Sequence, residues 1–249
     1  MRVEPVPGVP AATVDAGGER LLALADYHAG IEAGLQYEGV ELRSAASERR
    51  ERLLSALERT GADRLVVVGD LGHAIGSPFA SEREELEALF STLSVPVTLV
   101  KGNHDGELET VLEELDAGVT VAPSHGTTIG DVGFAHGHTW PAPAVLESAV
   151  VCVGHEHPVV RLEDKVGGTR KERVWLRGAL AGGPFEDHYD RPLDADGDLV
   201  VFPAFNDRSG GTWVNVAGQD FLAPFLPAGL ADAEAFLLDG TRLGRYRDV

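Results

Sequence analysis

The chain has 249 residues, and forty acidic residues against twenty-one lysines and arginines give it a formal net charge of −19 at pH 7. It contains no run of eighteen or more apolar residues, which excludes a transmembrane helix. One cysteine excludes an internal disulfide and fits a reducing cytoplasm, and the N-terminus lacks the charged region and apolar core of a signal peptide. We therefore expect a cytoplasmic protein without a membrane partner, folded as a single domain over residues 1–249.

Lysine is scarce in this chain. Only Lys101, Lys165 and Lys171 occur, beside eighteen arginines. Acidic surfaces repel themselves at low ionic strength, a property that halophiles use. Few lysines and many acids favour adaptation to a salt-rich cytoplasm and a haloarchaeal source, and the alternative is an ordinary acidic protein.

Apolar runs alternate with helical patterns along the first part of the chain, which predicts a layered α/β fold. Helices are expected over 47–59, where Ser47 would be the N-cap, over 81–93 and over 107–115. Continuous apolar runs are typical of strands that are buried on both faces. They occupy residues 20–25, 64–68, 95–100, 132–135 and 150–153.

The pattern changes after residue 157. Residues 161–162 and 173–176 are expected to form a hairpin around the Gly167-Gly168 turn. Residues 182–198 are rich in glycine and acid, which predicts a long loop. Strand structure is expected to return over residues 200–202 and 212–216.

Five short polar strings follow the five predicted strands, at the point where each strand ends. In open α/β sheets ligands bind beyond the carboxyl ends of the strands, so these strings are expected to meet in one crevice. They hold enough carboxylate, imidazole and amide groups for two metal ions, the arrangement of two-metal hydrolysis. Because all five strings lie before residue 160, residues 1–160 are the predicted catalytic half, and residues 161–249 are predicted to form a β-rich half. The strings are Asp26-Tyr27-His28, Gly69-Asp70, Gly102-Asn103-His104-Asp105, His136-Gly137-His138 and Gly154-His155-Glu156-His157.

Written as DxH, GD, GNHD, HGH and GHxH, in this order, the strings resemble the calcineurin-like metallophosphoesterases over roughly residues 20 to 160. The resemblance implies a four-layer sandwich of two packed mixed β-sheets with helices outside. It also implies that Asp70 bridges two metal ions through its carboxylate. The other implied ligands are Asp26, His28 and His157 at the first metal, and Asn103, His136 and His155 at the second.

The implied ligands are all nitrogen and oxygen donors, which favours manganese, iron, nickel or zinc over a soft-metal site. Manganese is the frequent choice in the family. The resemblance makes His104 the catalytic histidine, which would protonate the leaving oxygen or stabilise developing charge. Asp105 would hold the His104 imidazole in one orientation, and the nucleophile would be a metal-bound hydroxide.

Several residues near the strings carry two interpretations. His138 is expected to support a ligand or to face the substrate, and a direct ligand role is the alternative. His73 faces the phosphate in one interpretation and is a plain loop residue in the other. Glu156 is expected to point away from the metals, because side chains alternate along an extended segment. Asn206 and Gly210-Gly211 either line the mouth of the crevice or form a connecting turn.

Further strings resemble a narrower group, the ICC-like, SbcD-related phosphoesterases of archaea and the bacterial PdeM proteins. This resemblance extends over nearly the whole chain and implies a nuclease of DNA repair, with a helicase or another repair protein as partner. A homodimer is left open. The strings that carry it are residues 25–32, 154–158, 201–206 and 221–225, with the Gly210-Gly211 step.

The sequence therefore predicts a phosphodiesterase that acts on a phosphate ester, with DNA, a cyclic nucleotide or a small diester as substrate. The chain lacks the basic face of a typical DNA-binding protein, which weakens the nuclease prediction without excluding it. A phosphomonoesterase, including a protein phosphatase, is the enzymatic alternative. A scaffold on the same fold is a third hypothesis, and the presence of His104 argues against it.

Overall fold

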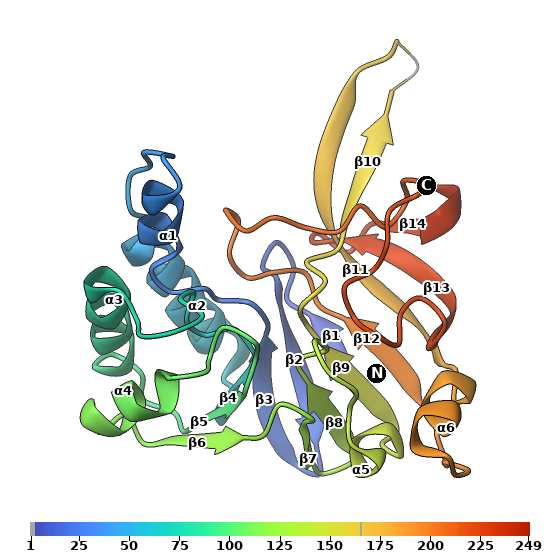
Figure 1. Ribbon diagram of the computed structural model, residues 1–249, viewed down its shortest axis with the longest axis horizontal. Helices are drawn as coiled ribbons and strands as arrows, with labels where there is room; N and C mark the ends of the chain where they lie inside the picture. The colour runs from blue at the N-terminus through green and yellow to red at the C-terminus, as the bar shows by residue number, and fades with distance from the viewer. Residues whose placement is uncertain (1–2, 165) are drawn as a thin grey trace.

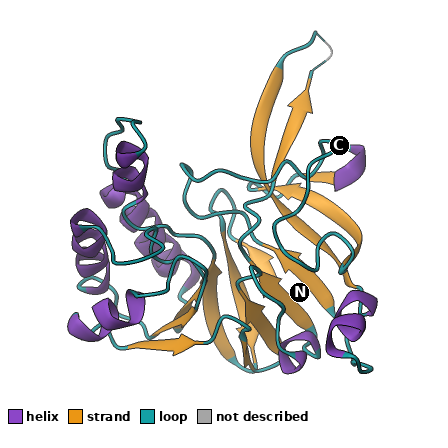
Figure 2. Ribbon diagram, viewed as in Figure 1, coloured by secondary structure: helices purple, strands orange, loops and turns teal. Residues whose placement is uncertain are grey.

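The computed structural model describes residues 3–164 and 166–249. Three residues lie outside the described ranges: Met1 and Arg2 at the N-terminus, and Lys165, which is one of the three lysines counted above. Two β-sheets pack face to face, and helices lie on the outside (Figures 1 and 2). Three groups of buried apolar side chains fill the spaces between the four layers. The predicted α/β sandwich of two mixed sheets flanked by helices is confirmed.

The first sheet has six strands that follow one another in space as they do in the chain. The first three are antiparallel, and the last four run parallel to one another. The carboxyl ends of β3, β4 and β5 therefore lie along one edge of the sheet. The strands are β1 (Val3–Pro5), β2 (Ala11–Ala16), β3 (Glu19–Leu24), β4 (Arg64–Val68), β5 (Val97–Val100) and β6 (Val119–Ala122).

The second sheet has the order β14-β13-β11-β12-β9-β8-β7, and β10 pairs with β11 off this path. Strands β8, β9 and β12 are parallel, and the other pairs are antiparallel. The hairpin of β10 and β11, drawn in yellow, extends beyond the body of the molecule (Figure 1). The strands are β7 (Thr127–Ile129), β8 (Val132–Ala135), β9 (Val150–Val153), β10 (Val159–Glu163), β11 (Thr169–Leu180), β12 (Asp198–Val201), β13 (Leu230–Leu237) and β14 (Arg242–Arg245).

Helices cover the outer faces of both sheets. Leu53, Leu86 and Leu108 from three helices pack with buried residues of β3, β4 and β5. Val145 and Phe185 from two further helices join the core on the outer side of the second sheet. The helices are α1 (Ile31–Tyr37), α2 (Ala46–Thr60), α3 (Ala80–Phe90), α4 (Leu108–Glu114), α5 (Pro143–Leu146) and α6 (Gly183–Tyr189), followed by a 3-10 turn η1 (Tyr246–Asp248).

Strand β3 shows why the predicted strands have continuous apolar runs. Leu22 and Leu24 face the helices, whereas Leu21 and Ala23 face the second sheet. Successive side chains point to opposite faces of a strand, so a strand inside a four-layer fold needs apolar residues at every position. Cys152 lies in the core between the sheets on the same principle.

Three local predictions are wrong. Helix α2 has Ala45 as its N-cap without a side-chain capping bond, and the Ser47 hydroxyl donates to Glu48 at 3.2 Å. The loop predicted over 182–198 contains helix α6, whose Phe185 is buried in the outer core. Residues 212–216 form only an isolated bridge between Trp213 and Val159, because the backbone turns directly afterwards with the Val216 N–H bonded to the Trp213 carbonyl.

No helix among the described residues combines the length and the apolar character needed to cross a membrane.

Candidate metal centre

The five polar strings meet at one place, as their position after the strands predicts. The Asp26 N–H donates to the Gly69 carbonyl at 3.1 Å and the His28 N–H to the Asp70 carbonyl at 2.9 Å, which joins the loops after β3 and β4. Across the two sheets, the His155 N–H donates to the Asp26 carboxylate at 3.2 Å. Residues 129 positions apart in the chain therefore share one crevice.

Three groups of described side chains are close enough for each to hold one metal ion. One is formed by His28, His73 and His104, and the other two contain predicted ligands only. Asp26, His28 and His157 form the first group, in which one potential ligand atom of each residue lies within 4.8 Å of the others. Asp70, His136 and His155 form the second group by the same measure. The family resemblance divides five of these residues in the same way and implies that Asp70 contacts both ions.

Asp70 lies between the two groups. Its Oδ2 is 3.3 Å from His136 Nε2 in the second group and 3.8 Å from His28 Nε2 in the first. Asn103 belongs with the second group, because its Oδ1 lies 3.2 Å from His136 Nε2. Asp70 is thus the carboxylate placed to contact ions in both groups, and all seven predicted ligands lie in one cluster.

Three histidines are oriented by backbone carbonyls. Nδ1 of His136 donates to the Val68 carbonyl at 3.0 Å, and Nδ1 of His157 donates to the Gly210 carbonyl at 3.2 Å. Nδ1 of His104 lies against the His73 carbonyl. In each case Nε2 then faces the Asp26 or Asp70 carboxylate. Such a bond on the far nitrogen is the usual way in which proteins fix a metal-ligating imidazole.

Two motif glycines leave room for the ligands themselves. A Cβ on Gly69 would stand 2.0 Å from Nδ1 of His136, and one on Gly102 would stand 2.1 Å from Oδ1 of Asp70. Neither position can carry a side chain unless a ligand moves. The glycines of the GD and GNHD strings are therefore required by the packing of the cluster, beyond their role in turning the chain.

Five of the seven predicted ligands have a left-handed backbone. Their φ angles are +58° for Asp26, +49° for His28, +50° for Asp70, +70° for His155 and +45° for His157. Aspartate and histidine tolerate this region better than most residues, but each instance still costs on the order of 1–3 kcal/mol. Such strain collects at functional sites, because it persists only where the surroundings hold it.

The charges of the cluster suit divalent cations. Burial lowers the pKa of His28 to about 3 and that of His155 to about 4, so both imidazoles are neutral. Burial would raise the pKa of Asp26 and of Asp70, but the histidines around them outweigh it and keep both as carboxylates. Burial likewise opposes protonation of His136, yet Asp70 raises its pKa to about 10. A metal ligand must be deprotonated, so a bound cation would replace the proton that Asp70 favours on His136. Buried carboxylates also need positive charge nearby, and these donors therefore fit a pair of divalent cations.

Asp105 does not have its predicted role. It is fully buried, and its two carboxylate oxygens accept the Gly72 N–H at 3.1 Å and the Gly102 N–H at 2.8 Å. It therefore joins the loops after β4 and β5, while the His73 carbonyl orients His104.

The structure places His73 and His138 beside the ligands. Nδ1 of His73 is 3.3 Å from Nδ1 of His28, and its ring stacks on His104 with 5.4 Å between centroids. The ring of His138 lies 5.2 Å from that of His136 and 6.0 Å from that of His155, and its buried Nδ1 has no hydrogen-bond partner among the described residues. Both loop residues therefore lie against the predicted ligands.

Residues of the C-terminal part of the chain hold the loops that carry the ligands. Asn206 is buried, and its Nδ2 donates to the Tyr27 and His28 carbonyls at 3.0 and 3.2 Å. Glu156 turns toward the C-terminal chain, where it accepts the Thr212 hydroxyl at 2.9 Å. The Gly210 carbonyl holds His157, as described above. The sequence carried no local signal for these contacts, because they join segments about 50 to 180 residues apart.

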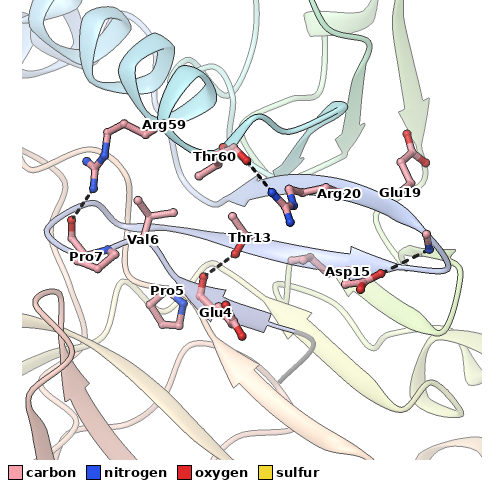
Figure 3. Close-up of a pocket in the computed structure, with 12 residues that line it drawn as sticks. Glu4, Pro5, Val6, Pro7, Thr13, Asp15, Glu19, Arg20, Arg59 and Thr60 are labelled. Carbon is pink, nitrogen blue, oxygen red and sulfur yellow. Dashed lines mark hydrogen bonds between the residues drawn. The ribbon is translucent and has the colours of Figure 1, made fainter.

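A cavity away from the metal centre contains no predicted metal ligand. It measures about 580 Å³ and lies between the first two strands and the end of α2 (Figure 3). Its guanidinium groups are engaged by carbonyls, Arg20 with Thr60 at 3.2 Å and Arg59 with Pro7 at 3.4 Å. None of its lining residues is a predicted ligand.

Comparisons with known proteins agree with this geometry. A family model described as the calcineurin-like phosphoesterase superfamily domain matches residues 20–180, which include every predicted ligand. Among solved structures, the chain is similar to Pseudomonas putida nuclease MPE, with a TM-score of 0.58 and 17% identity over 97% of this chain and 100% of that one. At this identity the similarity shows the fold alone. A search of curated protein sequences finds no match.

Proposed function

Because the chain belongs to the calcineurin-like phosphoesterase superfamily, we propose that it is a phosphodiesterase that uses two divalent metal ions and cleaves nucleic acid. The observation that carries the proposal is the place of Asp70. Its carboxylate lies between two groups of ligands, and His104 stands beside it, with Nε2 3.9 Å from Asp70 Oδ2.

The seven predicted ligands would hold the two ions, with Asp70 shared between them. When bound, such ions activate water and neutralise charge on a phosphoryl group. The donor set of nitrogen and oxygen favours manganese, with iron, nickel or zinc as alternatives. The protein orients the ligands. Backbone carbonyls fix His136 and His157, and the packed loops hold five ligand residues in the left-handed backbone conformation.

His104 is proposed as the residue that acts on the leaving group. Its side chain is 21% exposed, whereas Asp70 beside it is 3% exposed, so His104 can reach a substrate in the crevice. A histidine held by one nitrogen and free at the other can deliver a proton to a leaving oxygen. A scaffold without catalysis has no need for this arrangement, which argues against the scaffold hypothesis.

The choice of a diester in nucleic acid has two sources of support. One structural neighbour is a nuclease, and the sequence resembles the ICC-like and PdeM phosphoesterases over nearly its whole length. The role in DNA repair, a helicase partner, a homodimer, a cytoplasmic location and a haloarchaeal source belong to the same proposal. A phosphomonoesterase remains the second candidate, since the ligands suit either ester.

A substrate panel with manganese at high potassium chloride tests the proposal. It should compare bis(4-nitrophenyl) phosphate, 4-nitrophenyl phosphate, single-stranded DNA and a cyclic nucleotide. We expect faster hydrolysis of the aryl diester than of the monoester, together with cleavage of DNA. A marked preference for the monoester would favour the second candidate, and no hydrolysis of any ester by the metal-loaded protein would favour the scaffold.

A further inference from the structure

A second cavity opens directly beside the metal centre. It measures about 210 Å³, and His157, Asn206 and Gly210 form part of its wall. These are the residues that connect it to the site, because His157 is a predicted ligand held by Gly210, and Asn206 holds the backbone of His28. The cavity and the metal centre therefore share His157 as a common wall.

Two cations line the cavity from the root of the β10–β11 hairpin. Lys171 and Arg173 stand two positions apart on β11, so their side chains leave the same face of the strand. Neither forms an ion pair within 4 Å among the described residues. Lys171 instead lies over the Trp213 ring, with Nζ 5.8 Å from the centroid. In a chain with three lysines and a net charge of −19, an unpaired lysine beside the site is unusual.

Arg173 is held in place but keeps donors free. Its Nη1 donates to the Ala204 carbonyl at 2.9 Å, which fixes the guanidinium at the cavity wall. The hydrogen bonds it makes to described residues all use Nη1, although a guanidinium has five N–H donors. Burial and the neighbouring Arg52 lower the pKa of Arg173 and outweigh the opposite effect of Asp207 and Glu172, so its positive charge is incompletely balanced where it stands.

The carboxylates near the cavity do not cancel these cations. Glu172 and Asp207 also line it, but Asp207 lies 3.8 Å from Arg52 and shares its charge with that guanidinium. Glu172 pairs with Arg170 at 3.4 Å. The two cations that line the cavity therefore face two carboxylates that are each already engaged by an arginine outside the lining, and the local balance favours an anion.

We propose that this cavity is an anion-binding subsite in which Lys171 and Arg173 take a phosphate group next to the one that is hydrolysed. The proposal rests on the phosphodiesterase function given above and specifies its substrate class. A substrate with a single phosphate group leaves the subsite empty, whereas a nucleic-acid strand fills it with a neighbouring backbone phosphate. The site thus favours polyanionic strands over small diesters, without the extended basic face of a typical DNA-binding protein.

Lys171→Ala provides the test, because Lys171 holds no backbone group and the substitution should leave the fold intact. We expect KM for an oligothymidylate to rise about tenfold, a loss of about 1.4 kcal/mol, with kcat unchanged. For bis(4-nitrophenyl) phosphate, kcat/KM should stay within about twofold of the wild type. The slope of log KM for the oligonucleotide against log salt should fall by about one, and Lys171→Arg should restore most of the affinity.

Arg161→Ala is the matched control. Arg161 lies opposite Lys171 in the hairpin register, carries the same charge and pairs with Glu163, but it does not line the cavity. An equal loss in Arg161→Ala would mean that only the general charge of the hairpin matters, and would overturn the subsite. Equal losses on both esters in Lys171→Ala, or no loss on either, would overturn it as well.

A binding measurement separates this proposal from the catalytic one. Fluorescence anisotropy of a labelled oligothymidylate reports binding whether or not the strand is cleaved. If the wild type hydrolyses no ester, the proposed function fails, and the subsite stands only if Lys171→Ala still weakens this binding relative to Arg161→Ala. If the wild type is active but the two variants bind the strand alike, the subsite fails and the function stands.

Discussion

The strand-end loops and the C-terminal segment 204–225 meet at the same site but contribute different things. The loops supply all seven predicted ligands and His104. The C-terminal segment supplies none of these, yet it bonds to two of the five loops, those after β3 and β9. The Phe205 N–H donates to the Ala25 carbonyl at 2.8 Å, and the Ala223 N–H donates to Glu156 at 2.6 Å. The chemical groups of this centre therefore come from the loops, and the C-terminal segment adds to the support that the loops give one another.

Substitutions can test this difference between the two regions. A change in a loop should remove a chemical step, whereas a change in the C-terminal segment should hold a ligand less firmly. His104→Ala is expected to have the largest effect on turnover. It should keep both metals and substrate binding while kcat falls about 10²- to 10⁴-fold, the usual range for a general acid. The loss should be greater for DNA than for an aryl ester, whose phenolate leaves with little help from a proton.

His125→Ala is the control for this variant, since His125 is exposed and lies outside the cluster. Metal content and kcat on both substrates are the measurements. Equal losses on the two substrates would indicate that His104 stabilises charge without delivering a proton. Loss of a metal from His104→Ala would show that His104 is a ligand, and full activity on every ester would revive the scaffold hypothesis.

Asn206→Ala should show the contribution of the C-terminal segment. The variant leaves the Tyr27 and His28 carbonyls without their donor, so the loop that carries His28 is held less firmly. Metal affinity is expected to fall about 10- to 100-fold, the range for removing a group that orients a ligand. At saturating metal, kcat should recover, because no chemical group has been removed.

Asn215→Ala is a matched control for Asn206→Ala. Asn215 makes the same kind of bonds, accepting the Arg161 N–H at 2.9 Å and donating to its carbonyl at 2.9 Å, but it supports the hairpin and not a ligand loop. Metal titrations of the two variants should differ clearly. If both bind metal as the wild type does, the C-terminal segment does not position the ligands.

Salt should affect both regions together, through the surplus of acid in the whole chain. Repulsion between carboxylates grows as screening falls, so the melting temperature should drop when potassium chloride is lowered from molar concentrations. We expect a change of several degrees, since about 1 kcal/mol moves Tm by about 2–4 °C in a chain of this size. Circular dichroism between roughly 0.1 M and 3 M salt, a range in which the screening length falls from about 10 Å to below 3 Å, checks this. An unchanged Tm would remove the halophile hypothesis.

The sequence predicts the ligand-bearing half well because its signals are local. Strands β4, β8 and β9 have the predicted bounds, and the polar string after each reaches the common crevice. A buried strand requires an apolar run, and a strand end requires a turn. Both features can therefore be recognised from residues that are neighbours in the sequence. The ligand assignment comes from the resemblance of these strings to the calcineurin-like metallophosphoesterases, and each string follows such a run.

The C-terminal half is predicted less well because its structure depends on distant contacts. Strand β13 contains charged residues beside buried alanines and a half-buried phenylalanine, and it is formed by pairing with β11 across some fifty residues. Asn206 gave no sign of which backbone groups it would bind. The contact between the His73 carbonyl and His104 could not be predicted from the sequence either, because only the fold brings the loops after β4 and β5 together.

The metal content of Asp70→Ala tests the central claim most directly. Elemental analysis should find two metal ions per chain in the wild type and neither at full occupancy in Asp70→Ala, because Asp70 is the carboxylate between both groups. Asp116→Ala is the control, as Asp116 has nearly the same backbone conformation (φ +48° against +50°) but is exposed outside the cluster. It should retain both ions. Two fully occupied metal sites in Asp70→Ala would contradict the account.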